Sequence, residues 1–193
     1  MFIVTTSVQV ENKPVDIQFH SRTTQIQLLS RHLYRALSAV RFVLHSFWLL
    51  IAYFAVTPGE ATLYLGDTPV KIAEGEFLAK GLILGLYAIG LFLMLKITHH
   101  FRNLMYYFEA GNIFERPAID SVHQALKAGI AFATMSFIQA IIGSVYTFRA
   151  HALVDISFTT QILVAIIYFG LMYTLLWTLE IGHDLKDESE MTI

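Results

Sequence analysis

Four long apolar segments alternate with polar ones along the chain, at residues 39–56, 77–97, 128–148 and 158–181. Each is close in length to the roughly 20 residues with which a helix crosses a hydrocarbon core of about 30 Å. None carries a charge in its middle, and none shows the polar face that recurs every 3.6 residues in a soluble helix. The pattern predicts an all-α membrane protein with four transmembrane helices in a four-helix bundle.

The basic residues divide unevenly between the two sides of this arrangement. Ten Lys and Arg residues fall on the side where the chain begins, and three fall on the opposite side. Because short cytoplasmic loops are enriched in Lys and Arg, we expect both termini to be cytoplasmic. The expected localisation is the bacterial cytoplasmic (inner) membrane. The expected parts are a cytoplasmic segment at residues 1–36, a transmembrane domain at 37–183 and an acidic tail at 184–193.

The polar segments predict local structure of their own. Weak alternation over residues 2–20 predicts a hairpin. From residue 24 the pattern becomes helical and predicts an amphipathic helix on the inner leaflet, with basic residues toward anionic lipid. Two short apolar runs on either side of residues 66–69 predict a small extracellular hairpin. The apolar face of the amphipathic helix consists of Ile26, Leu29, Leu33 and Leu37.

The segment between residues 99 and 127 predicts two helices with a sharp connection. Gly111 and Asn112 interrupt the first helix, and Pro117 suits the first turn of the second. Both helices are expected on the cytoplasmic side, where they extend the second and third spans.

Overall composition narrows the classes of function. Hydrophobic residues make up 55% of the chain and charged residues 15%, whereas soluble domains carry about 25% charged residues. The 13 basic and 15 acidic residues give no reason to expect direct binding of nucleic acid. The 193 residues of the sequence include no cysteine, which excludes thiolate metal sites and cysteine nucleophiles in this sequence. No phosphate-binding glycine loop or hydrolase motif is visible, so the sequence favours a non-enzymatic protein.

Small residues at three- and four-residue steps predict close packing between helices. Packing within one chain is the favoured interpretation, and a homodimer through one of these faces is the alternative. The residues are Gly81 and Gly85 in the second span and Gly129, Ala133, Ser136, Ala140 and Gly143 in the third.

A polar layer is expected near the cytoplasmic ends of the spans, formed by Arg41, His45, Lys96 and Glu180. Because an unpaired carboxylate at this depth is costly, we expect Glu180 to pair with one of the other three. A ligand-binding or proton-sensing site is the alternative. No cofactor is predicted, but Glu180 and His183 have the i, i+3 spacing of metal ligands. Metal binding by these two with His99, or haem binding by His45, is therefore a second alternative.

Two stretches of the chain carry a resemblance. Residues 108–114 read Phe-Glu-Ala-Gly-Asn-Ile-Phe, and residues 182–193 read Gly-His-Asp-Leu-Lys-Asp-Glu-Ser-Glu-Met-Thr-Ile. They resemble the glycine–two residues–phenylalanine element and the closing Gly-x-x-Leu-x-x-Glu run of a widespread bacterial family of small four-span membrane proteins of unknown function. Met191 stands where that family usually has leucine. The resemblance covers about residues 40–193, and family members are often encoded beside a small helix-turn-helix regulator, which implies a cytoplasmic DNA-binding partner.

Together these observations predict a membrane sensor or anchor for a cytoplasmic partner such as a small transcriptional regulator. The predicted docking surface combines residues 99–127 with the tail. Four alternatives stay open: a tail that is only a solvated end of the chain, a tail that folds back to cap the helices, a metal- or haem-binding redox protein, and an immunity-type protein that guards the membrane through its outer loop. The predicted tail contacts are Asp184, Leu185, Asp187, Glu188, Glu190 and Met191.

Overall fold

Four long helices dominate the computed structural model, which describes residues 13–65, 68–73, 75–149 and 158–191. They are α1 (Lys13–Val56), α2 (Phe77–Ala110), α3 (Arg116–Arg149) and α4 (Phe158–Met191). Each contains one of the predicted apolar segments, and all four are long and apolar enough to cross a membrane. The prediction of four such helices is therefore confirmed.

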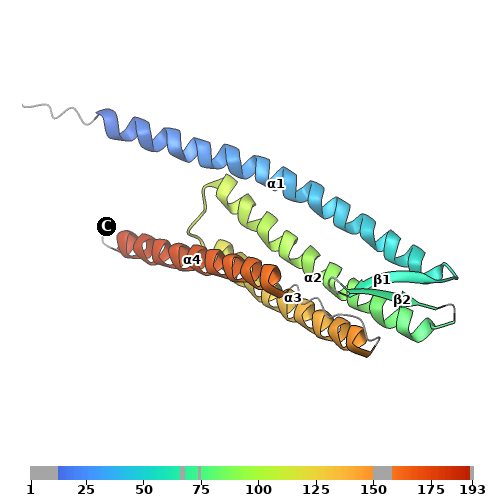
Figure 1. The fold of residues 1–193 in the computed structure, drawn as a ribbon. Helices are drawn as coiled ribbons and strands as arrows, with labels where there is room; N and C mark the ends of the chain where they lie inside the picture. The colour runs from blue at the N-terminus through green and yellow to red at the C-terminus, as the bar shows by residue number, and fades with distance from the viewer. Residues whose placement is uncertain (1–12, 66–67, 74, 150–157, 192–193) are drawn as a thin grey trace, which may run out of the picture.

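The helices form an open row (Figure 1). Among the described residues, the extensive helix–helix contacts join consecutive helices: α1 packs on α2, α2 on α3, and α3 on α4. One end of the row holds the beginning of α1, the α2–α3 connection and the end of α4, and we call it the terminal end. The opposite end holds two short strands, and we call it the hairpin end.

Large apolar side chains cover the outside of the row. Leu78 is 91% exposed, Val56 82% and Phe42 76%. Soluble proteins rarely leave so continuous an apolar surface in water, whereas lipid tails cover it without cost. The exposure indicates a multi-pass membrane protein.

The hairpin end is closed by β1 (Ala61–Leu65) and β2 (Thr68–Ile72), which pair antiparallel. Leu63, Val70 and Ile72 are buried in one cluster with residues of α1 and α2. The hydroxyl of Tyr87 on α2 donates to the carbonyl of Tyr64, and it accepts the Tyr64 N–H at 2.9 Å. Both strands also contact α3, so the hairpin fastens the first three helices together.

Helix α1 corrects two expectations about the chain's first part. It is continuous from Lys13 to Val56, so the hairpin expected at residues 2–20 is wrong for 13–20; residues 1–12 lie outside the described part. The amphipathic helix does not bend away from the first span but continues it along one axis (Figure 1). No local signal breaks this helix, since after Pro14, which suits a first helical turn, α1 contains no glycine or proline. Its 44 residues extend about 66 Å, twice the hydrocarbon core.

The connection between α2 and α3 forms where the sequence predicts it. Gly111 adopts φ +81°, and its N–H donates to the carbonyl of Phe108 while the N–H of Asn112 donates to that of Tyr107. This pair of hydrogen bonds is the Schellman motif, which ends a helix at a left-handed glycine. Helix α3 then begins at Arg116, with Pro117 in its first turn as predicted.

The best-packed core lies toward the terminal end. It joins α2, α3 and α4, and its members are Leu104, Ala118, Ile119, Val122, Ala125, Met172, Leu176 and Leu179. Leu104 and Val122 are almost fully enclosed. The core therefore holds the α2–α3 connection rigidly against α4.

Candidate functional site at the terminal end

Helix α4 meets the α2–α3 connection at one close contact. A Cβ built on Gly182 would lie 2.2 Å from Cε1 and 2.3 Å from Cδ1 of the Phe114 ring. One residue further, Nδ1 of His183 lies 2.8 Å from the carbonyl oxygen of Phe114, and as the N–H tautomer it donates a hydrogen bond there. Close approach thus favours glycine at position 182, because any side chain there would displace the ring.

This contact brings together the two stretches that carry the family resemblance. Phe114 ends the glycine–two residues–phenylalanine element, and Gly182 begins the closing run. They lie 68 residues apart in the chain, yet they touch in the structure. The two elements therefore form one structural unit, which the sequence alone did not reveal.

Helix α4 continues past this contact instead of ending there. Gly182 and the charged residues after it predict a helix end at this position, but α4 runs on to Met191. Two pairs spaced i, i+4 stabilise the extension, His183 with Asp187 at 3.7 Å and Lys186 with Glu190 at 3.9 Å. Residues 183–191 extend about 13 Å beyond the Phe114 contact as a helical arm, which we call the α4 arm.

The surface of the α4 arm is exposed and acidic. Asp184, Asp187 and Glu188 recur at three- and four-residue steps and share one helix face with Met191. Met191 is 82% exposed and Leu185 61%. Neither apolar side chain folds back to cap the helices, so that alternative is wrong.

A second arm extends from the beginning of α1. Gln27 lies beside the α2–α3 connection, with its Nε2 3.5 Å from a Cβ built on Gly111. Nearby, Nε of Arg31 forms an ion pair of 2.8 Å with Glu109 near the end of α2. The residues before Gln27 extend past the connection, as the blue end of α1 in Figure 1 shows. We call residues 13–26 the α1 arm.

The predicted polar layer forms only in part. Nη1 of Arg41 lies 3.5 Å from Nδ1 of His99, and His45 Nδ1 bonds to the Arg41 carbonyl at 2.7 Å. Nζ of Lys96 lies 5.9 Å from the centroid of an aromatic ring on its own helix. No salt bridge among the described residues joins Glu180 to Arg41, His45 or Lys96. Helix α4 packs on α3, at the far side of the row from α1, so the expected pair does not form.

The candidate metal ligands are likewise separated. His99 lies on α2 between Arg41 and Asn103, whereas His183 is bonded to the backbone of the α2–α3 connection. In the part of the chain that the structure describes, no three His, Asp or Glu side chains come together as a metal site would require.

The small residues have different surroundings in the two helices. Gly129 is buried against α4, and a Cβ there would lie 2.7 Å from Cε1 of Tyr168. Gly81 and Gly85 have open space beside them. The third-span face therefore packs within the chain as predicted at Gly129, whereas the second-span pair does not. Gly143 is buried, and half-buried positions on the same helix are Ala133, Ser136 and Ala140.

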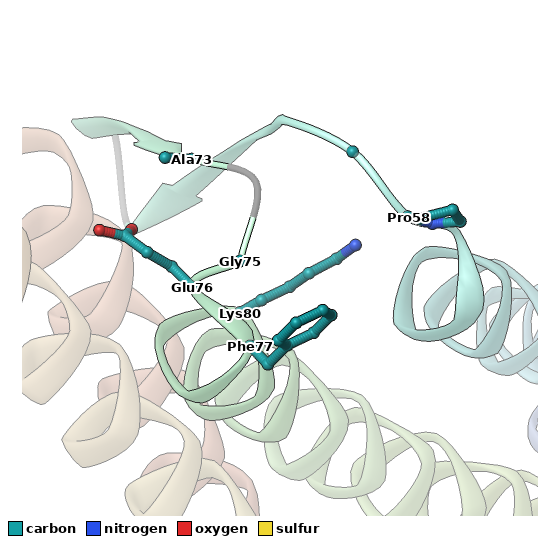
Figure 2. A pocket seen from close by; sticks show the side chains of 7 residues that line it. Pro58, Ala73, Gly75, Glu76, Phe77 and Lys80 are labelled. Atoms are coloured by element: carbon teal, nitrogen blue, oxygen red, sulfur yellow. The ribbon is translucent and has the colours of Figure 1, made fainter.

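A shallow hollow lies at the hairpin end (Figure 2). Nζ of Lys80 extends across it and donates to the carbonyl of Thr57 at 2.6 Å, which ties α2 to the end of α1. Its volume of about 50 Å³ is far below the roughly 300–1,000 Å³ of small-molecule sites, so it is not a ligand pocket. Its lining residues are Pro58, Gly59, Ala73, Gly75, Glu76, Phe77 and Lys80.

No family model, curated protein or solved structure matches this chain. The function is therefore inferred from the geometry of its own residues, and the terminal end offers the most distinctive geometry. Sequence reasoning missed the contacts of Phe114 with Gly182 and of Tyr34 with Arg102 there, and both join residues far apart in the chain.

Proposed function

We propose that this chain is a non-enzymatic protein of the bacterial cytoplasmic membrane that binds a cytoplasmic partner at its terminal end. The ten-to-three bias of basic residues supports an orientation in which the terminal end, and hence both arms, are cytoplasmic. The hairpin end then faces outward. The partner expected from the resemblance is a small helix-turn-helix regulator.

The single observation that carries this proposal is the α4 arm. It is a helix supported at its base by the Phe114 contact and exposed along its length. Neither membrane crossing nor core packing needs it, because the core ends at Leu179. An exposed helix with an acidic face and apolar side chains is suited to a basic partner with a hydrophobic groove.

A pull-down with a small helix-turn-helix regulator, taken from the genes beside this one, tests the docking function. Deleting residues 185–193 should abolish capture while the truncated chain still inserts and unfolds at the wild-type temperature in detergent. Neutralising the acidic face by Asp184→Asn, Asp187→Asn and Glu188→Gln should weaken capture, and added salt should weaken it for the wild type.

The matched control is Glu60→Gln with Glu76→Gln, which removes exposed acids at the hairpin end. This variant should capture the regulator as well as the wild type does. Undiminished capture by the chain lacking residues 185–193 would show that the α4 arm is not the docking surface.

Reporter fusions test the proposed orientation independently. Fusions after Ile193 and within residues 103–115 should report a cytoplasmic location, and one at Gly66 should report an external location. An external signal from the fusion at Ile193 would reverse the orientation and remove the basis for a cytoplasmic partner.

A further inference from the structure

Toward the terminal end, helices α1 and α2 carry cations without matching carboxylates. Arg35 and Arg41 lie on α1, and Lys96 and Arg102 lie on α2. Residues 17–56 of α1 contain no Asp or Glu, and the one acid of α2, Glu109, is paired with Arg31. None of the salt bridges between described residues includes any of the four cations.

Arg102 occupies the most constrained position of this group. Its guanidinium carbon lies 4.9 Å from the centroid of the Tyr34 ring on α1, a cation–π contact that fixes the side chain between the two helices. Its Nε is buried, and no described residue accepts the hydrogen bond that this N–H could donate. A buried donor without an acceptor destabilises a fold, so an apolar residue would suit this position better if packing were its only role.

Arg41 lies next along the same helix contact. Its Nη1 has a contact of 3.5 Å with His99 Nδ1, which is longer than a good hydrogen bond. Arg41 and Tyr34 are seven residues apart on α1, about 10 Å along the helix, so they lie on the same face. Two guanidinium groups are therefore presented along one side of the α1–α2 contact.

The depth of these residues matches a lipid headgroup layer. Counted at 1.5 Å per residue from Phe77, Lys96 lies about 28 Å and Arg102 about 38 Å along α2. A hydrocarbon core about 30 Å thick would end between them, where phospholipid phosphates lie. The headgroups at this level bring phosphate oxygens, which are hydrogen-bond acceptors with negative charge.

We propose that Arg102 and Arg41 bind the phosphate of an anionic phospholipid at the contact between α1 and α2. Guanidinium groups bind phosphate oxygens in pairs of charge-assisted hydrogen bonds, and the Tyr34 ring orients Arg102 for this geometry. The site rests on membrane insertion but is independent of docking at the α4 arm. Consequently, the chain lacking residues 185–193 should keep it.

Thermal unfolding of the full chain in a neutral detergent tests the proposal. Dioctanoyl phosphatidylglycerol should raise the unfolding temperature, and dioctanoyl phosphatidylcholine or inorganic phosphate at the same concentration should raise it much less. Arg102→Gln should weaken the apparent affinity for phosphatidylglycerol by about tenfold, the effect of losing one charge-assisted contact. The control Arg35→Gln removes the same charge from an exposed position on α1 and should change this affinity by less than about twofold.

Each other outcome overturns a defined part of the proposal. Equal losses in Arg102→Gln and Arg35→Gln would show a general attraction of basic residues to anionic lipid. Equal stabilisation by inorganic phosphate and phosphatidylglycerol would show a site for the free anion. If Arg102→Gln does not fold, the wild type still decides the question, since equal responses to phosphatidylglycerol and phosphatidylcholine exclude an anionic headgroup site.

Discussion

Replacing Gly182 by alanine tests the contact on which the terminal end is built. Alanine normally favours a helix by about 0.5–1 kcal/mol over glycine, so in open space this change would stabilise α4. Here the new Cβ would lie 2.2 Å from a carbon of the Phe114 ring, whereas carbon atoms in contact are separated by about 3.5–4.0 Å. The ring or the helix must therefore move by more than about 1 Å.

The cost of that movement can be estimated from its parts. Overpacking costs about 1–3 kcal/mol, and loss of the hydrogen bond between His183 and the Phe114 carbonyl costs about 1 kcal/mol. The Phe114 ring is 39% exposed and can turn outward, so the lower part of the overpacking range applies. After subtraction of the helix-forming gain, we expect Gly182→Ala to lower the free energy of unfolding by about 1–2 kcal/mol.

Reversible unfolding in mixed micelles measures this difference, and Gly170→Ala is the matched control. Gly170 lies on the same helix with nothing within 4 Å of its Cβ position, so the same substitution there should be neutral or stabilising. The double variant Phe114→Ala with Gly182→Ala should lose less stability than the two single changes added together, because the ring that clashes is gone. Equal stability of Gly182→Ala and Gly170→Ala would refute the close approach of α4 to the connection.

Three further substitutions test other contacts by the same unfolding measurement. Gly129→Ala should destabilise by about 1 kcal/mol because its Cβ would meet the α4 ring at 2.7 Å, while Gly85→Ala, which faces open space, should not; equal effects would remove the α3–α4 contact. Gly111→Ala should cost about 1–2 kcal/mol, since φ +81° disfavours a side chain, and no loss would contradict that turn. Arg31→Glu should lower the free energy of unfolding by at most about 1 kcal/mol. Adding Glu109→Arg should restore most of this loss, and no recovery would show that the ion pair does not form.

The four helices were predictable because membrane crossing depends on composition over about 20 residues, which the sequence displays directly. The α2–α3 connection was predictable for a similar reason. A left-handed helix end needs a glycine, and a helix start tolerates a proline, so Gly111 and Pro117 mark the turn by local chemistry alone. These features depend on neighbours in the chain, and sequence patterns report such neighbours well.

The course of the two arms depends on interactions that the local pattern does not show. Charged and polar residues at 183–191 by themselves predict a helix end, but they pair at i, i+4 spacing and continue α4 instead. Likewise, the amphipathic pattern before Leu37 predicts a helix lying on the membrane. The ion pair between Arg31 and Glu109 aligns that part of α1 with α2. Periodicity specifies a helix and its faces but not its direction, which neighbouring helices decide.

The candidate sites also depend partly on the local sequence and partly on the packing of the helices. The sequence by itself determined how many helices there are, where they turn and which residues can carry charge near the membrane surface. Only the tertiary structure decided that Phe114 meets Gly182, that Arg102 stacks on Tyr34, and that Glu180 lies apart from the basic residues expected to pair with it. The physical reason is that such pairs depend on the order and register in which helices pack, and packing between side chains from distant parts of the chain sets both.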